Sequence, residues 1–248
     1  MDPDYGRKYR ELYTRHWWWR AREEVIVEAL RRRLRPASGH RILDVGCGDG
    51  LFFDRLSEFG EVEGIEPAGD LVDPRGPHRE RIRVAPFDST FQPGRSYSLI
   101  LMLDVLEHLD APEEALRHAL ELLEPGGLVL ITVPAFRLLW TNHDRLNQHR
   151  TRYTKASFRR VAGAAGLQIL ECRYFFFWMF PVKLAVRLKE SLFPSAPGIP
   201  RLPPRWLNRW LYCFTRAEER VLRGLAIPLG NSLLAVGAKA SREDGRRR

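Results

Sequence analysis

The sequence predicts an α/β fold in which helices cover both faces of a doubly wound sheet. Apolar segments alternate with amphipathic ones through five successive strands, as expected for parallel strands joined by helices. Within the stretch 41–50 a short apolar run ends in an acidic residue and then in a turn with three glycines, and acidic residues also stand where later runs end. The expected strands are the run before this turn, then 61–66, 82–87, 97–103, 128–133, 167–174 and 232–240.

Helices are predicted from apolar spacing and from their start and stop residues. An amphipathic helix is expected over 51–59, a helix starts at Pro112 and stops at Pro125, and 155–165 is closed by Gly166. The connection 68–77 is rich in glycine and proline, so its helix should be short or absent.

The chain is expected to form one domain with attached segments. Residues 1–35 form an N-terminal helical lid around a helix at 16–33, in which His16, Trp17 and Arg20 fold over a ligand; packing on the sheet is the simpler alternative. The other expected parts are a binding core, 36–176, a basic aromatic helical insertion, 177–231, the final strand, 232–240, and a disordered tail, 241–248.

The glycine turn indicates the class of ligand. Gly46, Gly48 and Gly50 stand at every second position, which departs from the dinucleotide pattern, and Asp49 adds negative charge where a pyrophosphate would bind. Asp44 and Glu66 suit a ligand with an ammonium group, a sulfonium and a ribose diol. S-adenosylmethionine carries all three groups and is the predicted cofactor.

Acids at two further strand ends extend this prediction. Asp88 would accept from the adenine amino group, although Asp is also an ordinary turn residue. Asp104, Glu107 and His108 follow the apolar strand 97–103 at the carboxyl edge of the sheet, where ligands of such folds bind. For Glu66 the competing interpretation is a solvated acid at a strand end.

Composition limits the compartment and the partners. Three separated cysteines match no metal or redox spacing, and residues 1–15 are charged with no apolar signal segment, so we expect a cytoplasmic protein. The net charge is +9, and segment 177–231 supplies six of these charges through nine basic and three acidic residues. Its aromatic helices are too short to span a bilayer, which favours an anionic membrane surface at the inner face, or else a cap on the substrate pocket.

A loop dense in ionisable and aromatic side chains follows Pro134, and such loops often carry function. Its candidate substrate-binding residues are Arg137, Trp140, Asp144, His149, Arg152 and Tyr153. His143 in this loop and His108 at the strand edge are the candidate catalytic bases for a hydroxyl acceptor. His108 could equally serve only to bond the backbone at a helix start, and His143 and His149 could position an anionic head group with Arg137 and Arg152.

The chain resembles the class I S-adenosylmethionine-dependent methyltransferases, specifically small-molecule members of the type 11 or ubiquinone-methyltransferase kind. The resemblance rests on I-L-D-V-G-C-G-D-G at 42–50, Glu66, D-V-L-E-H-L at 104–109 and L-E-P-G-G at 123–127. It implies a seven-stranded Rossmann-like methyltransferase sheet with an antiparallel last strand and a helical insertion before it. It also implies cofactor-binding roles, which fall on Asp44, Gly46, Cys47, Gly48, Glu66, Asp88, Leu103 and Asp104.

Two further stretches, 16–22 and 134–154, are similar to a bacterial subgroup met beside glycosyltransferases and lipid-linked sugar enzymes, with departures at Trp19, Arg145 and Gln148. We therefore expect a small, lipophilic or lipid-linked acceptor and favour O-methylation. No metal is predicted; the alternative is a divalent ion on Asp104, Glu107 and His108, as in some ubiquinone-type relatives.

Two other functions compete with methylation of a lipophilic small molecule. RNA binding or RNA methylation would use the positive charge, although the chain has no N-P-P-Y tetrad and no cysteine nucleophile in the family's position. A non-catalytic, membrane-associated cofactor-binding module is the second.

Overall fold

The structure is a computed structural model that describes residues 3–35, 39–193, 196 and 198–239. Its centre is a seven-stranded sheet with the order β3-β2-β1-β4-β5-β7-β6, in which β7 runs antiparallel to both neighbours and the other pairs are parallel. The strands are β1 (His40–Val45), β2 (Gly60–Glu66), β3 (Ile82–Val84), β4 (Tyr97–Leu103), β5 (Leu123–Pro134), β6 (Leu167–Phe175) and β7 (Ser232–Lys239). The predicted fold class is confirmed.

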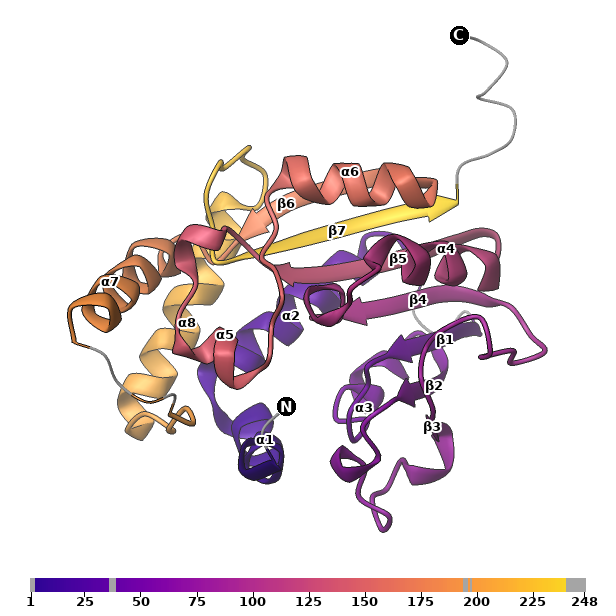
Figure 1. Ribbon diagram of the computed structural model, residues 1–248, viewed down its shortest axis with the longest axis horizontal. Coiled ribbons are helices and arrows are strands. Elements are labelled where there is room, and N and C mark those ends of the chain that lie inside the picture. Colours follow the sequence, from indigo (N-terminus) through magenta and orange to yellow (C-terminus); the bar gives the residue numbers. More distant parts are fainter. Residues whose placement is uncertain (1–2, 36–38, 194–195, 197, 240–248) are drawn as a thin grey trace, which may run out of the picture.

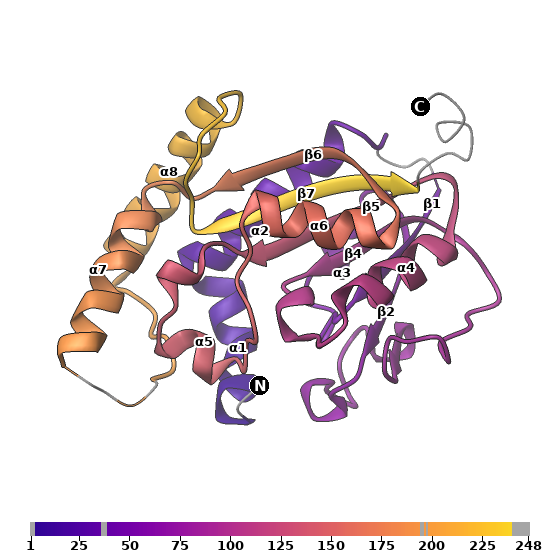
Figure 2. The ribbon, with the colours of Figure 1, turned by 45° about the horizontal axis from the view of Figure 1, so that its top comes forward.

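Helices lie on both faces of the sheet (Figures 1 and 2). One core cluster joins α4 and α6 to the sheet through Leu116 and Phe158, and the second joins α2 and the turn at α3 through Ile26 and Phe53. Parallel strands are accordingly apolar on both sides. The helices are α1 (Pro3–Arg15), α2 (Trp17–Arg31), α3 (Phe53–Leu56), α4 (Pro112–Leu122), α5 (Asn142–Leu146), α6 (Lys155–Ala165), α7 (Met179–Leu192) and α8 (Arg205–Leu222).

Strand register brings the ends of the central strands to one edge. Val45 of β1 is paired with Ile65 of β2 and with Met102 of β4. The residues that follow these strands therefore meet at the same edge. This alignment positions the candidate site.

Several elements match their predicted bounds and some do not. Strand β4 and helix α6 have the predicted limits, and Gly166 ends α6 with φ +83°. The predicted helix over 51–59 is wrong in length, because α3 has one turn before the chain enters β2 at Gly60. A Cβ at Gly60 would lie 1.9 Å from the His40 carbonyl oxygen, so the strand starts in backbone contact with β1.

The expected bounds of two strands also differ. Strand β3 ends at Val84 rather than at residue 87, and β5 already begins at Leu123, whose Cα pairs with Tyr97 before a register shift. Gly126 has φ +79°, which lets the chain pass through the proline and glycines without leaving the sheet. The predicted tail, 241–248, and residue 240 of the last expected strand lie outside the described residues.

Helices α7 and α8 lie together at one end of the molecule, away from β1, β2 and β3 (Figures 1 and 2). Asn208 of α8 attaches them to the N-terminal helices: its side chain accepts from the Trp17 amide at 2.9 Å and donates to the Arg15 carbonyl at 2.8 Å. Arg216 of α8 is buried and pairs with Glu28 of α2. Among the described residues, no helix has the length and apolar content needed to cross a membrane.

Candidate active site

A cavity of about 1490 Å³ opens at the carboxyl edge of the sheet. A pocket for one drug-sized ligand has about 300–1,000 Å³, so this cavity can hold two. The ends of β1, β2 and β4 form one wall, and side chains of α1, α2, α5 and α7 form the others.

The glycine turn lies on the wall formed by the strand ends. Gly46 and Gly48 have φ +70° and +53°, and a Cβ at Gly46 would meet Val105 at 2.8 Å. Glu66 fixes the turn, because its two carboxylate oxygens accept from the Gly48 and Ala68 amides, both at 2.9 Å. Burial raises the pKa of Glu66 despite these two hydrogen bonds.

Asp44 and Cys47 also line the cavity. Asp44 is buried, and this burial, with Glu66 nearby, raises its pKa to about 7 although Arg22 opposes the shift. The Cys47 thiol packs against Gly64, where a Cβ would lie 2.4 Å from Sγ. Burial raises the pKa of Cys47, so it stays a thiol.

Leu103 and Asp104 line the same wall. Asp104 has φ +56°, a strained value for a residue with a side chain. Arg22 of α2 holds its carboxylate with an Nη2–Oδ2 distance of 2.8 Å, and Thr132 donates to Oδ1 at 3.0 Å. Arg22 is only 7% exposed and was missed from the sequence, where a single arginine within an apolar helix stripe was the available signal.

Asp88 lies apart from the other predicted cofactor residues. It is exposed and is not among the residues that line the cavity; its side chain accepts from the Thr90 amide and hydroxyl at 2.9 and 2.6 Å. These bonds lower the pKa of Asp88. Its neighbour Phe87 does line the cavity.

His149 and Asp144 form a hydrogen-bonded pair in the loop that follows β5. His149 lines the cavity and its Nδ1 lies 2.9 Å from Asp144 Oδ1. Asp144 is fully buried and also accepts from Arg152 at 2.7 and 3.0 Å and from the Thr141 amide at 2.8 Å. Burial opposes its ionisation, but the bonds from His149 and Arg152 outweigh burial and hold the pKa of Asp144 well below its ordinary value.

The predicted catalytic histidines both line the cavity. Burial lowers the pKa of His108 to about 4 and that of His143 to about 3, so both rings are neutral at pH 7. His108 lies edge-on to His149, with ring centroids 4.9 Å apart. The Nε2 of His143 lies 3.1 Å from the side-chain nitrogen of Asn147.

Four of the predicted substrate-binding residues, Arg137, Trp140, Asp144 and Tyr153, are not among the residues that line the cavity. Arg137 is exposed and stacks on Trp140, and the Trp140 carbonyl accepts from Arg187 of α7. Tyr153 is buried and donates to the Leu106 carbonyl at 3.1 Å. These contacts join the loop to the core and to α7.

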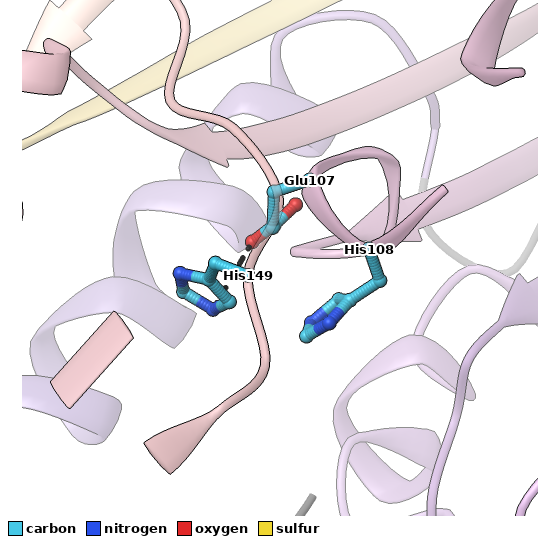
Figure 3. A group of neighbouring side chains, drawn as sticks. All are labelled: Glu107, His108 and His149. Atoms are coloured by element: carbon cyan, nitrogen blue, oxygen red, sulfur yellow. Dashed lines mark ion pairs between the residues drawn. The ribbon is translucent and has the colours of Figure 1, made fainter. Parts of the chain in front are cut away.

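Glu107, His108 and His149 have ligand atoms that all lie within 4.8 Å of one another (Figure 3). This set differs from the alternative predicted from the sequence, because Asp104 is paired with Arg22 and His149 takes its place. Neither carboxylate oxygen of Glu107 has a hydrogen-bond partner in the described part of the chain, and burial raises its pKa well above the ordinary value. One carboxylate and two imidazoles fit a divalent ion, which would act there as a Lewis acid; that no metal binds stays a prediction.

Further lining residues come from the N-terminal helices and from α7. Tyr9, Arg10 and Tyr13 reach the cavity from α1, and Trp17, Trp18 and Trp19 from α2. The predicted lid residues His16 and Trp17 line the cavity, whereas Arg20 is exposed and lies over Tyr212 of α8. On α7, the lining residues are Met179, Lys183, Val186 and Glu190.

Known proteins match this chain in sequence and in fold. A ubiquinone biosynthesis O-methyltransferase of Azorhizobium caulinodans is 30% identical over 161 residues, which are 56% of this chain and 63% of that protein. The chain thus spans less than two thirds of that relative's length. A ubiquinone biosynthesis O-methyltransferase of Rattus norvegicus is 31% identical over 109 residues, 40% of this chain and 32% of that protein.

Solved structures share the fold at low sequence identity. The [4+2]-cyclase SpnF has a TM-score of 0.55 at 20% identity, covering 90% of this chain and 83% of that one. An S-adenosylmethionine-dependent methyltransferase of Archaeoglobus fulgidus has a TM-score of 0.51 at 15% identity, covering 87% and 93%. A family model described as a methyltransferase domain matches residues 18–172. The chain therefore belongs to the methyltransferase domain family.

Proposed function

We propose that the chain is an S-adenosylmethionine-dependent methyltransferase that acts on a small lipophilic or lipid-linked molecule, with O-methylation favoured. The observation that carries the proposal is the cavity itself, which has the acidic glycine turn on one wall and the His149–Asp144 pair on another. Membership of the methyltransferase domain family supports the reaction, and the names of the ubiquinone O-methyltransferase relatives support the oxygen acceptor.

The cofactor would be held by the residues of the strand-end wall. Glu66 would accept from a ribose diol, and Asp44, Gly46, Cys47 and Gly48 would shape the pocket beside it. Leu103 and Asp104 would line the side from which the methyl group leaves. Asp88 would have to turn inward from its present exposed position to meet an adenine amino group.

The loop after β5 would prepare the acceptor. The bound cofactor would supply a methyl group attached to a positively charged sulfur. His149 would accept the proton of the acceptor hydroxyl at Nε2, since Nδ1 is the ring nitrogen that bonds Asp144. The acceptor oxygen would receive this methyl group, and the proton that it loses would be held on His149. In this proposal His149 is the base, while His108 and His143 contact the acceptor.

Isothermal titration with S-adenosylmethionine and with its demethylated product tests the cofactor. We expect micromolar binding of both, and about tenfold weaker binding in Glu66→Gln, which loses a charged hydrogen-bond acceptor. Glu61→Gln, on the exposed start of the same strand, is the matched control. Absence of binding for both compounds would overturn the proposal.

Mass spectrometry with labelled cofactor and a lipid extract of the producing cell tests the acceptor. A labelled methyl group on an extracted hydroxyl compound is expected. Label found only in RNA would favour the competing RNA methyltransferase function, and cofactor binding with no labelled product in either would favour a non-catalytic module.

We also propose that the segment 177–231 contacts an anionic membrane surface at the inner face of the membrane. Trp206, Trp210 and Phe214 are 72%, 56% and 42% exposed and follow one another every four residues along α8. The same segment carries exposed basic residues that have no ion pair to any described residue, namely Lys189, Arg201, Arg205, Arg209 and Arg220. Aromatic side chains that enter the head-group layer beside basic residues are typical of interfacial helices.

Liposome flotation with and without anionic lipid tests this contact. The protein should float with anionic vesicles and should stay in the dense fraction with neutral ones. If the protein floats with neither kind of vesicle, the membrane contact is rejected, and α7 and α8 serve only as a cap on the cavity.

A further inference from the structure

Lys183 is a cation that faces the cavity from a helix whose other lining residues are mostly apolar. Met179, Lys183, Val186 and Glu190 line the cavity at intervals of four, three and four residues, which is one face of α7. Lys183 is partly buried between the two apolar members of this face. It comes from the segment 177–231, which no family motif covers.

No hydrogen bond or ion pair joins Lys183 to any other residue in the described part of the chain. Asp144 and Glu190 are the two acids whose negative charges raise the pKa of Lys183, and both already have other partners. Asp144 accepts from Arg152, His149 and Thr141, and Glu190 accepts from the Asn142 amide at 2.8 Å. A cation shielded from water is normally paired, because an unpaired one loses its hydration without compensation.

The acceptor wall of the cavity is the part formed by the loop after β5 and by α7, and its second cation, Arg152, is not available to a ligand. Arg152 makes two bonds to Asp144 and a third to the Ala135 carbonyl at 3.0 Å. Arg137, which the sequence suggested as a partner for an anionic head group, is not a lining residue. Among the residues that the structure describes, Lys183 is therefore the cation of the acceptor wall whose ammonium group has no hydrogen-bond or ion-pair partner.

We propose that the acceptor carries an anionic group, a carboxylate or a phosphate, which Lys183 binds inside the cavity. This inference rests on the proposed function, since it names the acceptor's chemical class. The apolar neighbours Met179 and Val186 would cover the lipophilic part of the same molecule. Burial and Arg152 lower the pKa of Lys183 to about 8, so the side chain still carries its charge at pH 7.

Three probes with one chain and different head groups test the inference: farnesyl phosphate, farnesoate and farnesol. Their binding is measured by quenching of the tryptophans that line the cavity. Wild type should bind one or both anionic probes about tenfold more tightly than farnesol, as expected for a hydrogen-bonded ion pair. The two anionic arms distinguish a phosphate from a carboxylate.

Lysine substitutions separate the charge from the fold. Lys183→Met should remove the preference for the anionic probes and leave farnesol binding unchanged, whereas Lys183→Arg should keep the preference. Lys239→Met is the matched control, because Lys239 is exposed at the end of β7 and is not a lining residue. Equal binding of all three probes to wild type, or an equal loss in the Lys183→Met and Lys239→Met proteins, would overturn the inference.

Titration with the demethylated cofactor on the same samples keeps the two proposals apart. Normal cofactor binding with no preference for anions rejects the Lys183 site alone. A preference for anions that depends on Lys183, without cofactor binding, rejects the proposed reaction and retains the anion site.

Discussion

Asp144 organises the acceptor wall, because one buried carboxylate orients both His149 and Arg152. The sequence marked all three as substrate-binding residues and placed the catalytic role on His108 and His143. Their contacts favour a different division of roles. His149 has a carboxylate behind it and the cavity in front, whereas His143 is a very weak base with a pKa of about 3.

Substituting His149 should reduce methyl transfer more than substituting His143. His149→Gln removes the proposed base and should lower kcat by about 100-fold or more, the usual contribution of general base catalysis. His143→Gln should lower it by less than about tenfold, since a ring that binds a proton only near pH 3 contributes little as a base. Single-turnover rates with saturating cofactor measure both, and the reverse order would contradict the assignment.

The Lys183 ammonium should make binding of an anionic acceptor depend on pH. Asp144 and Glu190 raise its pKa, while burial and Arg152 lower it more strongly, to about 8, with neutral His143 nearby. As the pH rises through 8 the side chain loses its proton, and affinity for farnesyl phosphate should fall. Titrations from pH 6.5 to about pH 9.5, across the lysine range, measure this, with Lys183→Arg as the variant whose affinity stays constant. A flat wild-type profile would argue against the ion pair.

Helix α8 has a buried face that packs on the rest of the protein and an exposed face that is rich in aromatic residues. Thr215, Arg216 and Glu219 are buried; Arg216 pairs with Glu28 of α2, and Glu219 with Arg173 of β6 at 2.6 Å. The aromatic residues of the exposed face pack on one another: the rings of Trp210 and Phe214 stack with centroids 5.2 Å apart.

Removing the exposed tryptophans of α8 should abolish vesicle binding without unfolding the protein. Each of Trp206→Ser and Trp210→Ser should weaken partitioning by about tenfold, because each removes roughly 1.5–3 kcal/mol of apolar transfer. Val84→Ser is the matched control, an exposed apolar residue on β3 at the opposite edge of the sheet. Flotation gives the partitioning and urea denaturation the stability; unchanged flotation in the double variant would reject the membrane contact.

At the scale of the whole molecule, segments from both ends of the chain enclose one side of the sheet edge. Helix α1 meets the loops after β1 and β2 through Arg10, which pairs with Asp49 and Asp73. Asn208 connects the junction of α1 and α2 to α8. The resulting cavity lies beside the segment that carries most of the excess positive charge.

Salt should weaken vesicle binding but not eliminate it. Raising NaCl from about 0.05 M to about 0.5 M shortens the screening length several-fold and removes most of the attraction between exposed arginines and anionic lipid. Insertion of the α8 aromatic residues is not screened, so residual binding should remain. RNA binding, measured in parallel by filter retention, should disappear at the higher salt. Tight RNA binding at physiological salt, with none to vesicles, would support the competing function.

The sequence by itself determined the fold class and which strand-end residues meet at the cavity, with the exception of Asp88, because both depend on local patterns. Apolar runs give the strands, Gly166 ends α6, and positive φ at Gly46 and Gly48 favours residues without a side chain. The spacing of Asp44, Glu66 and Asp104 is informative because parallel strands end at one edge.

Only the tertiary structure decided the acceptor side, because its contacts join residues far apart in the chain. Arg22 reaches Asp104 and Thr132 across the sheet edge, and its place within an apolar helix stripe did not identify these partners. Lys183 is one of nine basic residues in its segment. It becomes the candidate anion ligand because α7 turns it toward the cavity beside Arg152, whose charge is already paired with Asp144.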